Sequence, residues 1–201
     1  IHVSTDYVFD GGKATAYVEN VAVNPQGVYG KSKAAGEDGV GTTLGSHVIA
    51  RTAWLYSPFG QNFVKTMLRL GRERDAVSVV ADEWGSPTSA LELARGLLGS
   101  AGAGGMIRRR GTGPPITSRA VARRTGGLVR AAFEASAEVG GPVAEVVDIA
   151  TADWPAKAKR PLNSGLCCDL FAGTFGYRAP DWRPSVVETT VRIVKETPFS
   201  N

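Results

Sequence analysis

Residues 1–12, with the sequence IHVSTDYVFDGG, decide the fold class. The run from Ile1 to Phe9 is rich in residues that favour strands, and Asp10-Gly11-Gly12 predicts a turn directly after it. Residues 28–38, VYGKSKAAGED, follow a loop at residues 24–27 and contain small residues that are compatible with a helix. A strand followed by a turn and a helix is typical of the beginning of an α/β fold.

The same alternation of strands and helices continues along the chain. Strands are predicted at residues 47–56, 77–80 and 144–149, and helices at residues 62–72, 118–138 and 185–195. A capping box, Ser89-x-x-Glu92, opens one more helix, on which Leu91, Ala94 and Leu98 share one face. We therefore predict an α/β fold, a partial Rossmann-like doubly wound parallel sheet with a smaller substrate-binding region.

The composition describes an ordinary soluble globular chain. Of its 201 residues, 43% are hydrophobic and 21% are charged, which excludes a disordered or collagen-like protein. No apolar run is long enough for a transmembrane helix, so no membrane partner is expected. The adjacent Cys167 and Cys168 are too close for an ordinary disulfide, and we expect them to pack in a reducing cytoplasm. No metal site is expected, because His2 and His47 have no ligand partner at suitable spacing.

The net charge of +4 comes from one local cluster of arginines. Between Met106 and Arg130 there are seven arginines and no acidic residue, whereas the rest of the chain has 16 basic and 19 acidic residues. Three of these arginines follow Met106-Ile107, where an interior strand would need apolar residues. The cluster at 108–130 stays unexplained. A solvated face is its expected role, and no nucleic-acid partner is expected.

Tyr29 and Lys33 form a Tyr-x-x-x-Lys pair, which a helix places on one face, one turn apart. A free phenol titrates near pH ~10 and is a poor acid at neutral pH. An ammonium group ~4 Å away, at an effective dielectric of ~20, stabilises the phenolate by roughly 4 kcal/mol. The pair therefore predicts a general acid, although Tyr-x-x-x-Lys alone is a weak motif.

Ser4-Thr5-Asp6 supplies the context that the pair lacks. A hydroxyl at the carboxyl end of a parallel strand lies where open α/β sheets bind ligands, so Thr5 can hydrogen-bond the oxygen that Tyr29 protonates. With these residues, the chain resembles the extended short-chain dehydrogenase/reductases, and among them the dTDP-4-dehydrorhamnose reductase family. The matching words are STDYVFDG at 4–11, YGKSK at 29–33 with Gly36-Glu37, RTAWLY at 51–56, NFV at 62–64, DEWGSPT at 82–88, RPLNS at 160–164 and DWR at 181–183.

This resemblance implies reduction, by NADPH or NADH, of the 4-keto group of dTDP-4-dehydrorhamnose to give dTDP-L-rhamnose, for nucleotide-sugar and cell-surface polysaccharide biosynthesis. It implies that Tyr29 donates the proton, that Lys33 acidifies the phenol and holds the nicotinamide ribose, and that Thr5 binds the developing alkoxide. It further implies cofactor contacts at Val3, Tyr29 and Lys33, and substrate contacts at Thr5, Asp6 and Trp54. A complete protein of this kind is compatible with a homodimer.

A glycine-rich turn between the first strand and first helix, which a dinucleotide-binding fold needs for the pyrophosphate, is not found in this sequence. The glycines at 39–45 and 102–105 occur in the wrong order, after a helix. We therefore expect the chain to lack the N-terminal cofactor segment and to be inactive alone. Residues 1–49 and 73–119 are expected to belong to the dinucleotide-binding domain, and residues 50–72 and 120–201 mostly to the substrate-binding region.

Other interpretations of the same residues remain open. Tyr29 and Lys33 can be a packed tyrosine and a surface charge, Trp54 can be core packing, Asp6 can be a turn residue, and residues 82–88 can simply shape a loop and a helix start. The alternative functions are a non-catalytic subunit resembling the regulatory subunit of methionine adenosyltransferase, another nucleotide-sugar epimerase or dehydratase, and a nucleic-acid binder.

Overall fold

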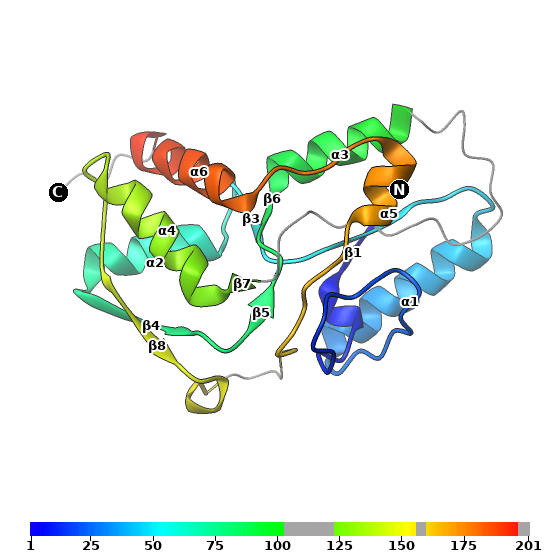
Figure 1. The fold of residues 1–201 in the computed structure, drawn as a ribbon, viewed down its shortest axis with the longest axis horizontal. Coiled ribbons are helices and arrows are strands. Elements are labelled where there is room, and N and C mark those ends of the chain that lie inside the picture. Colours follow the sequence, from blue (N-terminus) through cyan, green and yellow to red (C-terminus); the bar gives the residue numbers. More distant parts are fainter. Residues whose placement is uncertain (103–122, 156–159, 197–201) are drawn as a thin grey trace.

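The computed structural model describes residues 1–102, 123–155 and 160–196, in which strands alternate with helices (Figure 1). The strands are β1 (His2–Thr5), β2 (Ile49–Thr52), β3 (Leu55–Tyr56), β4 (Ala76–Val80), β5 (Trp84–Gly85), β6 (Thr88–Ser89), β7 (Arg123–Arg124) and β8 (Glu145–Ile149). The helices are α1 (Val28–Thr43), α2 (Phe63–Glu73), α3 (Ala90–Gly102), α4 (Thr125–Ala137), α5 (Asp169–Phe175) and α6 (Trp182–Glu196), with short 3-10 turns η1 (Asp6–Val8) and η3 (Thr151–Asp153).

Three of the four strand pairs in the described part are parallel. Strand β1 pairs with β2, from His2 opposite Ile49 to Thr5 opposite Thr52, and β3 pairs with β6 and β4 with β8 in the same sense. The fourth pair, β5 with β7, is antiparallel. Parallel strands need long crossovers, and here the crossovers contain helices. The α/β fold class predicted from the sequence is confirmed.

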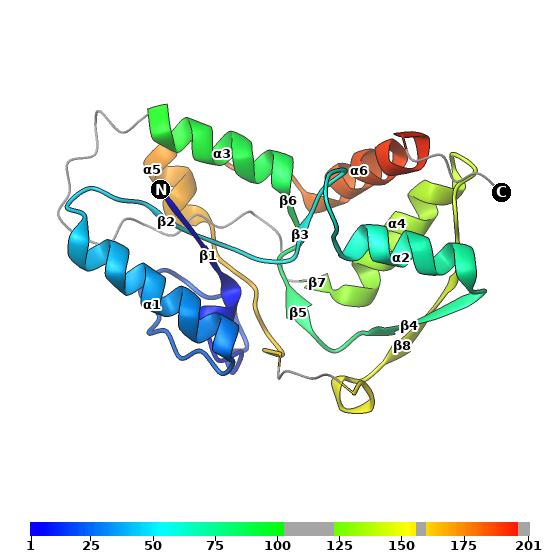
Figure 2. The same ribbon diagram turned by 180° about the vertical axis from the view of Figure 1, so that it is seen from behind.

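Two groups of elements lie at opposite ends of the molecule in both views (Figures 1 and 2). Helices α2, α4 and α6 gather with β4 and β8 at one end, and α1 and α5 lie beside β1 at the other, with the short strands β3, β5, β6 and β7 between them. Within residues 1–102, 123–155 and 160–196, no helix has the length and apolar character needed to cross a membrane.

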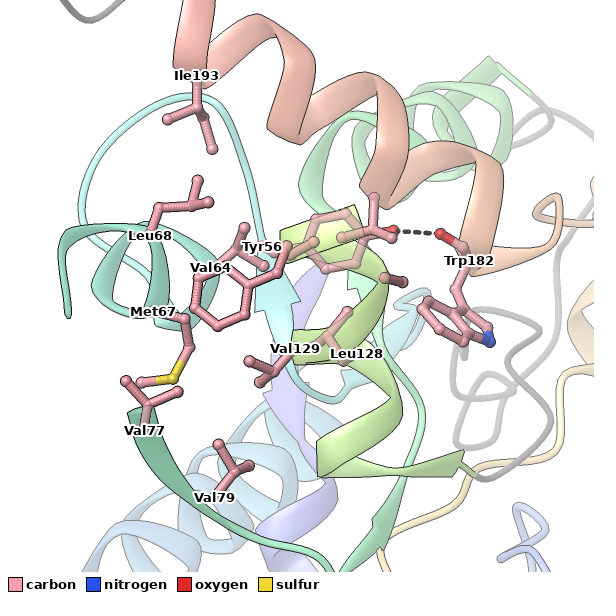
Figure 3. Close-up of a cluster of buried hydrophobic side chains, with 14 residues drawn as sticks. Tyr56, Val64, Met67, Leu68, Val77, Val79, Leu128, Val129, Trp182 and Ile193 are labelled. Carbon is pink, nitrogen blue, oxygen red and sulfur yellow. Dashed lines mark hydrogen bonds between the residues drawn. The ribbon is translucent and has the colours of Figure 1, made fainter. Parts of the chain in front are cut away.

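The largest apolar core lies at the end formed by the three helices. Figure 3 shows side chains of α2, α4 and α6 pointing toward a common centre, with Val77 and Val79 of β4 at one side. Tyr56 is fully buried in this cluster, and its hydroxyl donates to the backbone carbonyl oxygen of Trp182 (3.1 Å). A buried phenol needs such a partner, so this bond fixes the start of α6 against β3.

Helix α1 is fastened to the β1–β2 pair by polar groups as well as by packing. Arg51 of β2 donates two hydrogen bonds to the Glu37 carboxylate, at 2.9 Å and 2.6 Å, and both side chains are buried. At the beginning of the helix, a side chain on Gly30 would overlap the carbonyl oxygen of Tyr7. Glycine at this position therefore lets the first turn of α1 lie directly on the backbone of η1.

Several predicted elements agree closely with the structure. The strands expected at 77–80 and 144–149 are β4 and β8, and the helices expected at 62–72 and 185–195 are α2 and α6. Asn62 caps α2, because its side chain accepts from the backbone N–H of Lys65. Helix α1 begins at Val28 as predicted but continues to Thr43, five residues beyond the expected end.

Other predictions need correction. The strand predicted at 47–56 is two strands, since the backbone turns at Trp54 with φ of 44°. The initial strand ends at Thr5, because that residue caps η1. The helix predicted from 118 begins only at Thr125, since residues 123–124 pair with β5, and residues 118–122 lie outside the described part.

The apolar face predicted for α3 is also wrong. Leu98 is 74% exposed and Ala94 is exposed, whereas Leu93 is buried with Phe171 of α5. The reason is that α5 and Tyr177, which the sequence patterns did not place, pack on the side of α3 that contains Leu93.

We predict that Gly30→Ala destabilises the chain by about 1–3 kcal/mol, because the methyl group would force α1 away from Tyr7. Gly39→Ala is the matched control on the same helix. A side chain there meets open space, so alanine should stabilise the helix by up to ~1 kcal/mol. Urea unfolding measures both effects, and equal stability of the two variants would contradict the packing described for Gly30.

Candidate functional site

The end of strand β1 presents a buried hydroxyl and a buried carboxyl side by side. Thr5 is the last residue of β1, and its Oγ1 accepts from the backbone N–H of Tyr7 (3.2 Å) while donating to Oδ1 of Asp6 (2.9 Å). The first bond caps η1, which turns the chain so that Asp6 points inward. Two residues that the sequence singled out are thus joined directly.

One carboxylate oxygen of Asp6, Oδ2, is buried without a hydrogen-bond partner among the described residues. The residue is 2% exposed, and burial raises the pKa of its carboxyl to about 6, although the hydrogen bond from the Thr5 hydroxyl and the nearby hydroxyl of Ser164 oppose this shift. Within the described residues Oδ2 has no hydrogen-bond partner, since the Ser164 hydroxyl donates its proton to the Trp84 carbonyl oxygen (3.3 Å). Buried polar atoms normally have a hydrogen-bond partner, so this oxygen is an exception among the described residues.

Helix α1 brings Lys33 to β1 and Tyr29 to η1. The Lys33 ammonium donates to the carbonyl oxygen of Val3 in β1 (2.7 Å). One turn earlier, the ring of Tyr29 meets the edge of Tyr7, with centroids 5.9 Å apart and an interplanar angle of 73°. Tyr29 remains 57% exposed, so its phenol is accessible to a ligand while Lys33 is held in place.

Trp54 occupies the turn between β2 and β3 in a strained backbone conformation. It is the only non-glycine residue with a positive φ in the described part of the chain, and such a conformation costs about 1–3 kcal/mol. Its carbonyl oxygen accepts from the backbone N–H of Thr88 (3.2 Å), and its half-buried indole lies over Gly85 of β5. Backbone strain of this kind is common at functional sites.

Two segments that are distant in sequence, residues 84–86 and 162–166, are bonded to each other beside Asp6. The backbone N–H of Trp84 donates to the Leu162 carbonyl (2.7 Å), and that of Ser164 donates to the Trp84 carbonyl (2.8 Å). Leu166 donates its backbone N–H to the hydroxyl of Ser86 (3.1 Å). These bonds hold Ser164 near Asp6, a contact that no sequence pattern indicated.

A second group of charges surrounds Tyr7. Glu83 is buried, and this burial raises its pKa, while the nearby Arg160 lowers it. Burial also raises the pKa of Tyr7, and the negative charge of Asp6 adds to this shift. Tyr7, Glu83 and Arg160 were not among the predicted site residues, although each lies within a sequence word that we singled out. Only their position within these motifs could have indicated them from the sequence.

The predicted residues lie on β1 (Val3 and Thr5), on η1 (Asp6), on α1 (Tyr29 and Lys33) and on the turn after β2 (Trp54). Of the clustered arginines, Arg130 pairs with Asp148 (2.9 Å), Arg123 and Arg124 form β7, and Arg108, Arg109, Arg110 and Arg119 lie outside the described residues. Among described side chains, no group of three or more His, Cys, Asp and Glu could hold a metal ion.

Comparison with known proteins identifies the family to which this chain belongs. Residues 1–194 match the family model of the RmlD substrate binding domain. The chain belongs to the dTDP-4-dehydrorhamnose reductase family. It is 41% identical, over 203 aligned residues, to a dTDP-4-dehydrorhamnose reductase of Sinorhizobium fredii, an alignment that covers 96% of this chain and 64% of that protein. Membership confirms the resemblance seen in the sequence.

Solved structures of the family share the fold. A dTDP-4-dehydrorhamnose reductase from Clostridium acetobutylicum matches with a TM-score of 0.84 at 34% identity, covering 94% of this chain and 63% of that one. The Bacillus anthracis reductase, solved in complex with NADP, matches with a TM-score of 0.81 at 32% identity, covering 98% and 65%. The chain thus spans less than two thirds of the length of these relatives.

We predict that Asp6→Asn makes the stability of the chain less dependent on pH. Because the folded-state pKa is raised to about 6 from 3.8, stability falls as pH rises between these values. Above about pH 6 the asparagine variant should be more stable than the parent by up to roughly 3 kcal/mol, and below about pH 4 this difference should vanish.

Urea unfolding across this pH range measures the effect, with the exposed Asp38→Asn as control. A difference between the Asp6→Asn variant and the parent that is the same at every pH would contradict the raised pKa.

Proposed function

We propose that this chain forms the proton-donating and sugar-binding part of an NAD(P)H-dependent reductase that converts dTDP-4-dehydrorhamnose to dTDP-L-rhamnose. One observation carries the proposal. An accessible phenol, Tyr29, stands at the beginning of α1 beside η1, while Lys33 on the next turn is bonded to β1. This arrangement supports an acid that is positioned by the helix and exposed to substrate.

The residues of this chain fit a nicotinamide cofactor only on its reacting side. Lys33 donates to the carbonyl oxygen of the exposed Val3 of β1, and Tyr29 lies one helical turn before Lys33, so these residues would hold the ribose and ring there. The bound cofactor supplies the hydride that the sugar carbon accepts. No glycine-rich turn for a pyrophosphate occurs between a first strand and a first helix in residues 1–201, so the proposal covers only the reacting side of the cofactor.

Tyr29 gives its hydroxyl proton to the 4-keto oxygen as negative charge develops on that atom. Lys33 lies one helical turn further along α1, and its ammonium would stabilise the resulting phenolate by Coulomb attraction. Because Lys33 is bonded to a strand carbonyl, little reorganisation is needed during the reaction.

Thr5 can stabilise the same oxygen when its hydrogen bond to Asp6 reverses. In the structure, Thr5 donates to Asp6 and accepts from Tyr7. A hydroxyl has one donor and two acceptor positions, so a protonated Asp6 can donate to Thr5 and release the Thr5 proton toward the substrate. Burial raises the pKa of Asp6 to about 6, and protonation of this carboxyl would allow the exchange. Trp54 would contact an apolar face of the 6-deoxyhexose.

We predict that Tyr29→Phe lowers kcat at least about 10²-fold in the full-length gene product that contains these residues, because the general acid is lost. Oxidation of NADPH with dTDP-4-dehydrorhamnose measures the rate, and a separate titration measures cofactor affinity, which should change little. Tyr177→Phe is the control, since this tyrosine bonds Glu92 on α3. A kcat of Tyr29→Phe equal to that of the parent would refute the assignment.

A further inference from the structure

The backbone conformation of Gly85 does not require a glycine. It lies in β5, opposite residue 123 of β7, and its φ is not among the positive values that favour glycine. Any residue could adopt this extended conformation. The reason for glycine must therefore come from what surrounds the position.

The indole of Trp54 fills the space that a side chain at position 85 would need. A Cβ built on Gly85 would overlap Cε2 and Cζ2 of the indole and lie 2.6 Å from its Nε1. The ring thus lies directly on the backbone of β5. Since Gly85 is a neighbour of Trp84, whose carbonyl oxygen accepts from Ser164, the indole is linked to the strand that holds Ser164 near Asp6.

The backbone of Trp54 shows that the ring position is imposed by its surroundings. A bulky residue rarely adopts a positive φ unless neighbouring contacts over-determine it. Here the carbonyl oxygen is held by Thr88, and the ring packs against the cluster that includes Val8 and Leu166. Because Trp54 is only half-buried, part of the ring remains available to a ligand.

We propose that Gly85 is a positioning residue for substrate binding. Its missing side chain lets the Trp54 indole lie flat against β5 as a preformed apolar wall for the 6-deoxyhexose. This inference rests on the proposed function. It predicts that a side chain at position 85 displaces the indole and weakens sugar binding, while the acid on α1 and the cofactor contacts on β1 are unaffected.

The test compares Gly85→Ala with Gly99→Ala in the full-length gene product. A side chain at Gly99, on α3, meets open space. In fluorotryptophan-labelled protein, fluorine NMR resolves the tryptophan signals, and Trp54→Phe assigns the signal of Trp54. We expect Gly85→Ala to shift that signal and to raise the KM for dTDP-4-dehydrorhamnose at least about 10-fold, with unchanged cofactor affinity. Gly99→Ala should do neither.

Two further outcomes distinguish failure of the role proposed for Gly85 from failure of the proposed reductase function. An unshifted Trp54 signal, or a shifted signal with an unchanged KM, would overturn the role of Gly85 and leave the reductase assignment intact. If the parent protein does not reduce the sugar, the proposed function fails, while the NMR comparison still tests the packing.

A double variant guards against misfolding of Gly85→Ala. If Gly85→Ala does not fold, Gly85→Ala/Trp54→Ala should regain the thermal stability of Trp54→Ala alone, because the overlapping ring has been removed. Failure of the double variant to recover would contradict the steric argument.

Discussion

The buried ion pair between Glu37 and Arg51 is the interaction on which the site depends. It joins α1 to β2 through two hydrogen bonds, and the Arg51 guanidinium also lies over the ring of Phe9, 5.0 Å from its centroid. Loss of one partner of such a pair leaves an uncompensated buried charge, at a cost of about 3–5 kcal/mol. Because two desolvated charges contribute little net stability together, the consequence of the pair is a fixed geometry. Lys33, one turn before Glu37, adds a second anchor on β1, and the two together set the height and rotation of the helix that presents Tyr29.

Two close approaches complete the arrangement, and both need a missing side chain. Gly30 lets α1 touch the backbone of Tyr7, and Gly85 lets the indole of Trp54 lie on β5. The close approach at Gly30 brings the Tyr29 phenol to the end of β1. The close approach at Gly85 places the Trp54 ring against β5, the strand whose Trp84 is bonded to Ser164 near Asp6. The hydrogen bonds of Glu37 and Lys33 and the close approaches at the two glycines thus define a site between elements that are far apart in sequence.

Local patterns in the sequence were sufficient for much of the fold. Phe63, Met67 and Leu70 recur at helical spacing behind the cap Asn62, and α2 follows that pattern within one residue at each end. Local patterns failed where tertiary contacts decide. The apolar run around Trp54 contains a bend of the backbone that divides it into two strands, and α3 is buried on the side that α5 covers rather than on the side of Leu98.

For the candidate site, strand-end position and helical spacing predicted which residues to consider, but not how they are bonded. The Thr5–Asp6 hydrogen bond follows from η1, and the influence of Ser164 on Asp6 follows from a crossing of distant segments. Neither can be derived from spacing. The residue ranges assigned to a dinucleotide-binding and a substrate-binding region stay a prediction.

Transfer of isotope tests the proposed reduction most directly. The full-length gene product would be incubated with dTDP-4-dehydrorhamnose and NADPH carrying deuterium at the transferable position, and the product would be examined by NMR and mass spectrometry. Our account predicts a single deuterium on C4 of the sugar, in dTDP-L-rhamnose. A sugar product that contains no deuterium, as an epimerase or dehydratase with a recycled cofactor would give, would contradict it.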